Sequence, residues 1–144
     1  MLKMIDAHIH LDHYKDDEIS QLMETIPQIE NLISVSYDLE SCKRNHGFTG
    51  KYQKVRAAFG YHPEQPLPTG EQQNELFSWM NDHIDVMIAI GEVGLPYYLR
   101  KKQKVTTCQY EQYIKLLEAF VQKASTYGKP IVLHAVHEDA PIVL

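Results

Sequence analysis

The sequence has few cysteines and no long apolar run. Its 2 cysteines, Cys42 and Cys108, lie far apart and form no Cys-x-x-Cys pair, which argues against a disulfide framework and against a thiolate zinc site. No stretch approaches the roughly 18 uncharged apolar residues that a membrane-spanning helix needs. The N-terminus also lacks the basic and apolar regions of a secretory signal. We therefore expect a cytoplasmic protein that does not enter a membrane.

Basic residues are in the minority, since the formal net charge is −5. This charge argues against a broad basic surface that would bind nucleic acid without specificity. Any binding of phosphate must then be local, through a metal ion, histidines or backbone amides. Of the 144 residues, 44% are hydrophobic and 23% are charged, a composition typical of a single globular domain. We expect one domain over residues 1–144.

Short apolar runs alternate with longer amphipathic stretches, as is typical of repeated strand-helix units. The predicted strands are residues 4–8, 32–36, 55–59, 86–90 and 131–134. Helices are predicted between them, where apolar residues recur every three or four positions, at residues 16–26, 38–48, 72–82 and 108–127. The sequence therefore predicts an α/β chain with about five parallel strands.

The last predicted helix has the clearest pattern. Thr106 and Gln109 form a capping box at its start, and Gly128 favours its end. Its apolar stripe is expected to pack in the core and consists of Tyr110, Tyr113, Ile114, Leu117, Phe120, Val121 and Ala124.

Polar side chains collect where the predicted strands end. In a parallel sheet these ends lie at one edge, so residues far apart in the sequence converge there. Side chains two residues apart on a strand point the same way, so His8 and His10 can reach one ion. Alternatively, one of the two histidines caps the strand and the other faces solvent. The residues at the strand ends are Asp6, His8, His10, Tyr61, His62, Pro63, Glu92, His134 and His137.

Glu92 follows the fourth predicted strand and lies between Gly91 and Gly94. Divalent ions accept imidazole nitrogen and carboxylate oxygen, and two ions can share one carboxylate. Glu92 is therefore the natural bridge between two ions. The other interpretation is a charged turn residue between two turn glycines, and for His134 it is a hydrogen-bonded histidine in the core.

Four motifs together resemble the TatD family of metal-dependent hydrolases, which are amidohydrolase-like TIM barrels. The motifs are Met-Ile-Asp-Ala-His-Ile-His-Leu-Asp at residues 4–12, Ala-Phe-Gly-Tyr-His-Pro-Glu at 58–64, Ala-Ile-Gly-Glu-Val-Gly-Leu-Pro-Tyr-Tyr at 89–98 and Pro-Ile-Val-Leu-His at 130–134. The resemblance runs through the whole chain in the family's order. It implies a (β/α)8 barrel, of which this chain is the front portion.

The resemblance also implies the roles of individual residues. His8 and His10 would bind one ion, Glu92 would bridge two ions, and His134 would bind the second ion. His62 would contact the substrate phosphate instead of a metal. The implied cofactors are two divalent ions of the Zn, Mn, Mg, Co or Ni type.

Two departures from the family pattern stand near these motifs. Pro96 replaces an aspartate that commonly follows the bridging glutamate, and the arginine expected after His134 is absent. We expect His137 to contact the substrate in place of that arginine. A basic cluster follows the Glu92 motif, and it either meets an anionic substrate or forms a solvated loop; it consists of Arg100, Lys101, Lys102 and Lys104.

A (β/α)8 barrel takes about 250 residues, so 144 residues are expected to form its front half. In the family, a further metal-binding histidine and a catalytic aspartate come from later strands, beyond Leu144. The last residues of the chain resemble the start of another helix, with Pro141 in its first turn and Asp139 as its cap.

The resemblance implies a metal-dependent hydrolase that cleaves phosphodiester bonds in DNA through a metal-activated water. Two alternatives stay open. The same ions would serve a hydrolase of a small amide, lactone or phosphoester, because the motifs report metal chemistry and not the substrate. The chain would otherwise be an inactive metal-binding half-barrel with a structural or associative role.

A front half of a barrel leaves strand edges and apolar faces without their neighbours. We expect the isolated chain to self-associate through these edges or to be poorly soluble. Light scattering checks this expectation, and a monodisperse monomer at high concentration would contradict it.

Overall fold

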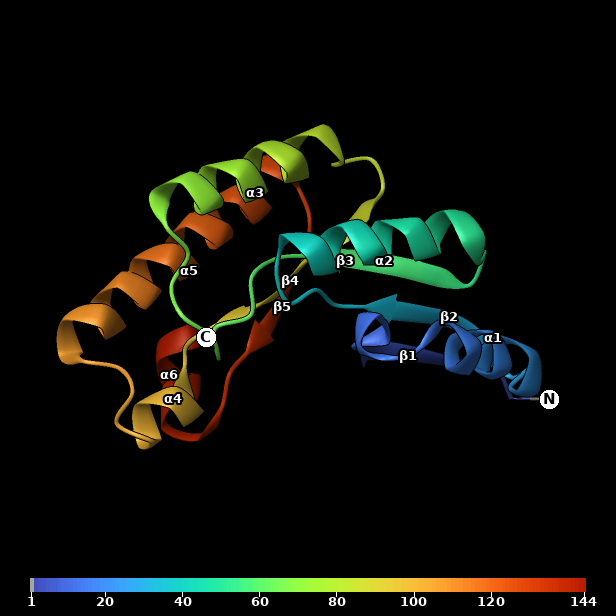
Figure 1. The fold of residues 1–144 in the computed structure, drawn as a ribbon, viewed down its shortest axis with the longest axis horizontal. Coiled ribbons are helices and arrows are strands. Elements are labelled where there is room, and N and C mark those ends of the chain that lie inside the picture. Colours follow the sequence, from blue (N-terminus) through green and yellow to red (C-terminus); the bar gives the residue numbers. More distant parts are fainter. Residues whose placement is uncertain (1) are drawn as a thin grey trace.

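A computed structural model describes residues 2–144 (Figure 1). Its five strands form one parallel sheet in the order of the sequence, β1-β2-β3-β4-β5. The strands are β1 (Met4–Ile9), β2 (Ile29–Ser34), β3 (Val55–Phe59), β4 (Met87–Gly94) and β5 (Ile131–His134). The sheet curls into a half-barrel, which confirms the predicted parallel α/β architecture.

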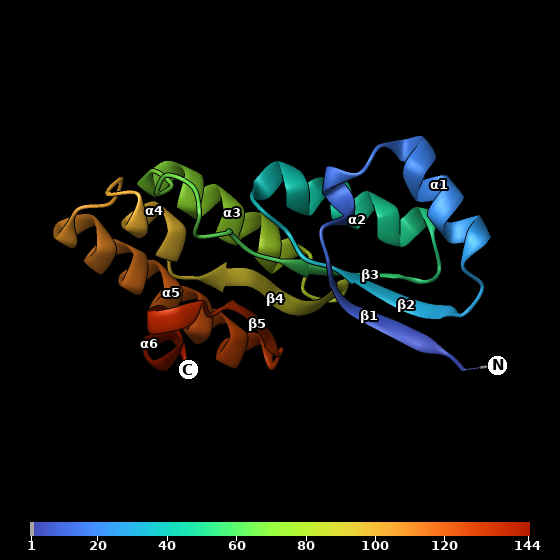
Figure 2. The same cartoon turned by 90° about the horizontal axis from the view of Figure 1, so that it is seen from below.

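Helices connect the strands and cover the convex side of the sheet. The α-helices are α1 (Asp16–Thr25), α2 (Leu39–Lys51), α3 (Gly70–Asp82), α4 (Tyr97–Lys101), α5 (Thr107–Tyr127) and α6 (Ala140–Val143). Single 3-10 turns follow the first and last strands, η1 (Leu11–His13) and η2 (His137–Asp139). Figure 2 shows α1, α2 and α3 following one another along one face of the curved row of strands. None of the helices within residues 2–144 has the length and hydropathy needed to cross a membrane.

The principal core lies between the sheet and helices α3 and α5. Its largest fully buried side chains include Phe59, Met80, Leu95 and Phe120. Strand β3 shows why the sheet has two different faces: Ala57 and Phe59 point into this core, whereas Ala58 belongs to a small cluster on the other face. Small side chains on that concave face leave room at the centre of the half-barrel.

Helix α5 has the predicted ends. The Thr106 hydroxyl accepts a hydrogen bond from the Gln109 N–H at 3.2 Å, and Gly128 ends the helix with a φ of 63°. The predicted stripe is wrong at Val121, which is 48% exposed. Leu116 is buried in its place, because a helical stripe with a period of 3.6 residues passes from Tyr113 through Leu116 to Phe120.

The observed strands differ from the predicted ones at their ends. Strand β1 extends to Ile9 and β4 extends to Gly94, so Asp6, His8 and Glu92 lie within strands instead of following them. Strand β2 begins and ends earlier than predicted. The extension of β4 follows from its pairing with β5, in which Gly94 is level with His134.

Gly91 and Gly94 are strand residues that allow β5 to lie close to β4, which excludes the interpretation as turn glycines. A Cβ atom on Gly91 would lie 2.6 Å from the Cβ atom of Val132. A Cβ atom on Gly94 would overlap the carbonyl oxygen of His134. The two glycines thus set the distance between the strands that carry Glu92 and His134.

The predicted cap of the last helix is wrong. Pro141 does lie in the first turn of α6, but the Asp139 side chain makes no capping bond. Asp139 is fully buried and accepts hydrogen bonds from Arg100 at 2.5 Å and from the Tyr110 hydroxyl at 2.9 Å. The long-range charged partner prevails over the local cap, because a buried carboxylate needs compensation. Arg100 therefore joins α4 to η2 and is not part of a solvated loop.

We predict that Gly94→Ala destabilises the chain by about 1–3 kcal/mol, since the added methyl group meets the backbone of His134. Gly47→Ala is the matched control, because Gly47 lies in α2 with nothing within 4 Å of its Cβ position. That change should stabilise the chain by about 0.5–1 kcal/mol. Urea unfolding monitored by circular dichroism measures both, and equal midpoints for Gly94→Ala and wild type would contradict the packing argument.

Candidate metal centre

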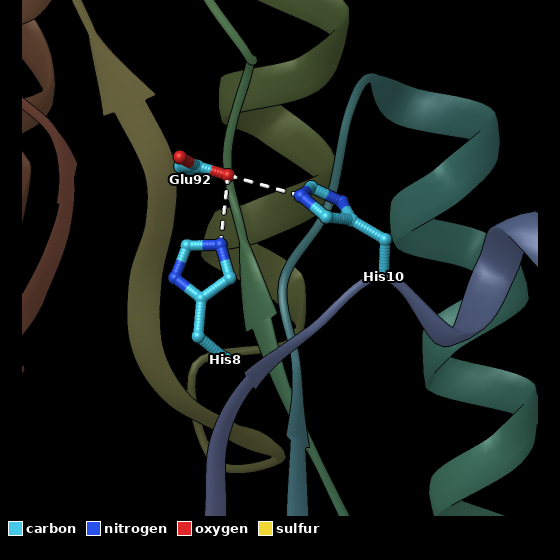
Figure 3. Close-up of side chains that lie close together, drawn as sticks. All are labelled: His8, His10 and Glu92. Carbon is cyan, nitrogen blue, oxygen red and sulfur yellow. Dashed lines mark hydrogen bonds and ion pairs between the residues drawn. The ribbon is translucent and has the colours of Figure 1, made fainter. Parts of the chain in front are cut away.

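Glu92 lies at the middle of a group of histidines on the concave face of the half-barrel. Its side chain is only 6% exposed, and its Oε2 atom lies 3.1 Å from His8 Nε2 and 3.1 Å from His10 Nε2. Figure 3 shows the two imidazole rings approaching the same carboxylate oxygen from neighbouring positions of one chain segment. The predicted convergence of these two rings on one point is therefore present.

The other oxygen of Glu92 faces a different strand. Its Oε1 atom lies 3.1 Å from Nδ1 of His134, the last residue of β5. His62 follows β3, and its Nε2 atom lies 3.6 Å from Oε2. The structure thus brings together residues from β1, β4, β5 and the segment after β3.

Two groups of side chains around Glu92 have the spacing of a metal site. In one of them His8 and His10 join Glu92, and in the other His62 and His134 do so. Within each group the nitrogen and oxygen atoms lie within 4.8 Å of one another. Both groups use the same carboxylate, so Glu92 is the shared member.

The curl of the sheet explains how β1 reaches β4, which is not its neighbour in the sheet. The segment after β2 crosses to β4 through two backbone hydrogen bonds, from Ser36 N–H to the Gly91 carbonyl at 3.1 Å and from Glu92 N–H to the Ser36 carbonyl at 3.2 Å. Ser36 is itself fully buried. These bonds draw the carboxyl ends of β2 and β4 together, and the end of β1 follows because it pairs with β2.

The carboxylate and its histidines shift one another's pKa values. Burial alone would raise the pKa of Glu92, but hydrogen bonds with His10 and His134 lower it below its usual range. The hydrogen bond to Glu92 raises the pKa of His10. Burial lowers the pKa of His134, but hydrogen bonds and charges of the two nearby carboxylates outweigh it and raise the value. Glu92 is therefore ionised and attracts positive charge to this centre.

His62 is different, because burial lowers its pKa to about 4. Its ring is therefore neutral near neutral pH. The Glu64 backbone N–H donates a hydrogen bond to Nδ1 of His62 at 3.1 Å, so the single ring proton lies on Nε2. His62 thus presents an N–H donor and not a lone pair to the centre, which favours contact with a substrate oxygen over ligation of a metal.

The remaining side chains fit divalent metal ions by their chemistry. Imidazole nitrogens and a carboxylate oxygen are the ligands of Zn, Mn, Co or Ni, and a bridging carboxylate serves pairs of such ions. His10 contacts Glu92 through its Nε2 atom. Its buried Nδ1 atom has no hydrogen-bond partner within the part of the chain that the structure describes.

The sequence reasoning assigned no role to Asp12 and His13, which lie beside His10. With His10 they form a third group of close side chains. The His13 ring stacks on the His10 ring with centroids 5.0 Å apart, and Asp12 accepts a hydrogen bond from the Ser41 hydroxyl at 2.7 Å. Asp12 lies two residues after His10 in the first motif. The same two-residue spacing that placed His8 beside His10 could have indicated that Asp12 lies near them.

The sequence also predicted no role for Glu64, although it is the last residue of the motif at residues 58–64. Its Oε1 atom lies 3.2 Å from Nε2 of His134. His137, in contrast, is exposed, and its ring lies 5.0 Å from that of Tyr97. The groups of close ligand atoms within residues 2–144 do not include His137. Its expected contact with a substrate stays a prediction.

A curled parallel barrel sheet whose strands end in histidines around a buried glutamate is the architecture of barrel-type metal-dependent hydrolases. The model of the TatD related DNase family matches residues 5–143. The chain belongs to this family, as its motifs indicated.

Relatives and solved structures agree with this membership. The chain is 39% identical to an uncharacterized metal-dependent hydrolase of Haemophilus influenzae, over 98% of this chain and 55% of the relative. It is 26% identical to the uncharacterized metal-dependent hydrolase YabD of Bacillus subtilis, over 70% of this chain and 40% of the relative.

Two crystal structures show the same fold. A TatD family hydrolase of Entamoeba histolytica superposes with a TM-score of 0.75 at 20% identity, over 99% of this chain and 52% of that one. The TatD homologue YJJV of Escherichia coli gives 0.64 at 23% identity, over 90% and 49%. The chain thus spans about half the length of the proteins that it matches.

We predict that Glu92→Gln lowers the affinity of the metal-stripped chain for Zn²⁺ by about 100-fold or more. The change keeps the shape of the side chain but removes the charge between the histidines, and loss of a mere partner of a metal ligand already costs about 10–100-fold. Isothermal titration calorimetry measures the affinity.

The matched control is Glu40→Gln, since Glu40 is exposed and pairs with Lys43. It should bind Zn²⁺ as the wild type does. Equal affinities for wild type and Glu92→Gln would remove Glu92 from the centre.

Proposed function

We propose that this centre holds two divalent ions bridged by Glu92 and that the protein hydrolyses phosphodiester bonds in DNA. The observation that carries the proposal is that the two carboxylate oxygens of Glu92 face different histidines. Oε2 faces His8 and His10, and Oε1 faces His134. A carboxylate that serves as a single-ion ligand or as a core ion pair would not need two separate sets of imidazoles.

In this proposal His8 and His10 hold one ion and His134 holds the other. When bound, such ions lower the pKa of a water molecule and polarise a phosphoryl oxygen. Glu92 stays ionised, because its histidine partners hold its pKa below the usual range. Its charge would offset part of the charge of the ions.

His62 acts on the substrate. Its neutral ring directs Nε2–H toward the centre, because Nδ1 is occupied by the Glu64 N–H. A phosphate oxygen placed beside Glu92 would accept this hydrogen bond without competing with a metal for a nitrogen lone pair. The role that the resemblance implied for His62 is thus supported by its hydrogen bonding.

A second candidate is a hydrolase of a small phosphoester, amide or lactone. The cleft that His8 and His10 line has a volume of about 640 Å³, and its lining includes two carboxylates, Asp6 and Glu18. Together with a net charge of −5, these carboxylates repel a long polyanion more than a small ester. The same centre in an inactive chain with a structural role is the remaining alternative.

Hydrolysis of a short single-stranded DNA in the presence of Mn²⁺ or Zn²⁺ tests the proposal. We predict that a chain extended to full barrel length cleaves the DNA, that chelation of the metal abolishes cleavage, and that Glu92→Gln lowers the rate by at least about 100-fold. The chain of 144 residues is assayed beside it.

Cleavage by the extended chain alone would assign the activity to the complete barrel. If neither chain cleaves DNA while both bind metal, the deoxyribonuclease proposal fails. A panel of small phosphoesters, amides and lactones then identifies the substrate class.

A further inference from the structure

The ring of His134 is held between two carboxylates. Its Nδ1 atom lies 3.1 Å from Oε1 of Glu92, and its Nε2 atom lies 3.2 Å from Oε1 of Glu64. The side chains of His134 and Glu64 are only 12% and 14% exposed. Both nitrogens of the ring thus have a defined partner, and the two partners come from β4 and from the segment after β3.

Glu64 is itself fixed by the first turn of α4. Its Oε1 atom accepts a hydrogen bond from the Tyr98 N–H at 2.8 Å, and its Oε2 atom accepts one from the Leu99 N–H at 2.9 Å. Backbone N–H groups at a helix start have no partner within the helix, so a carboxylate there is held firmly. Glu64 therefore presents its oxygen to His134 from a rigid position.

The contacts of Glu64 differ from those of a metal ligand. Both of its oxygens accept backbone hydrogen bonds, and Glu64 is absent from the groups of close ligand atoms found within residues 2–144. Its position behind the ring, on the side away from Glu92, is that of a partner that orients a ligand.

We propose that Glu64 is a positioning residue that accepts the Nε2–H of His134 and thereby directs the lone pair of Nδ1 to the ion beside Glu92. A histidine binds a metal only through an unprotonated nitrogen, so the proton of the neutral ring must lie on the other one. Carboxylates that accept the second N–H of a metal-bound histidine fix its tautomer and orientation. This inference rests on the proposed metal centre and adds a residue to which no role has been given.

Helix α4 takes part in this arrangement. It is five residues long, begins three residues after β4 ends, and donates both N–H groups to Glu64. The Tyr98 ring also meets the His134 ring at a centroid distance of 6.4 Å. Glu64 thus connects the loops after β3, β4 and β5 at the point where His134 enters the centre.

Long-range proton–nitrogen NMR spectra of the imidazole rings test the proposal, with the His134 signals assigned from the spectrum of a His134→Gln variant. In the metal-free wild type at alkaline pH, the ring should populate an Nε2–H form beside an Nδ1–H form, because a carboxylate faces each nitrogen. In Glu64→Ala the Nε2–H form should be lost, because only Glu92 still accepts a proton from the ring. The Zn²⁺ affinity of the variant should fall about 10–100-fold, measured by calorimetry.

Two further variants separate positioning from simple helix capping. Glu64→Gln keeps an oxygen acceptor for α4 but puts an amide group beside the ring, so it should also disturb the tautomer while the fold is retained by circular dichroism. Gln72→Ala is the control, since Gln72 caps α3 through the Thr69 N–H at 2.9 Å and contacts no ring of the centre. It should change stability alone.

An unchanged His134 tautomer in both Glu64 variants would overturn the proposal and leave Glu64 as a helix cap. The spectra of the metal-free chain report on Glu64 even if the wild type binds no Zn²⁺. Failure of the wild type to bind Zn²⁺ would refute the proposed metal centre and not the role of Glu64. The two failures are therefore distinguishable, and neither depends on a hydrolysis assay.

Discussion

The buried carboxylate of Glu92 is the constraint on which the arrangement of the site depends. Removing a carboxylate from water costs several kcal/mol unless charges and hydrogen bonds compensate for it. In this chain the compensation comes from outside β4, through the imidazoles of His8, His10 and His134. The sheet must therefore curl until the end of β1 reaches β4. The backbone hydrogen bonds between Ser36 and β4 hold it in that form.

Small residues make this curl compatible with close packing. Ala58 and Ala89 line the concave face, and Gly91 and Gly94 let β5 approach β4. The large side chains of the core, such as Phe59 and Phe120, all lie on the convex side beneath the helices. The concave face carries only a small apolar cluster, and polar side chains from several strands meet there. Most of the apolar core and the candidate metal centre therefore lie on opposite faces of one sheet.

The sequence predicted those parts of the molecule that follow from local patterns. Parallel strands, the capping of α5 and the convergence of His8, His10, Glu92 and His134 could be derived from periodicity, spacing and the rule on strand ends. Glu64 could not, because its position beside His134 depends on α4, which at five residues is too short to show a periodic pattern. Asp139 was misassigned for a related reason: its partner Arg100 is remote in the sequence.

The largely buried carboxylates of Asp139, Glu64 and Glu92 show how one functional group serves different purposes according to its partners. Asp139 meets a guanidinium and a hydroxyl, which satisfies it and joins two loops. Glu64 accepts hydrogen bonds from two backbone N–H groups, which hold it in place, and His134 is the one ring that it contacts. Glu92 meets only titratable imidazoles, whose protons a metal ion can replace. Exchangeable partners distinguish Glu92 from the other two, and of the three carboxylates Glu92 is the one that belongs to the groups of close ligand atoms within residues 2–144.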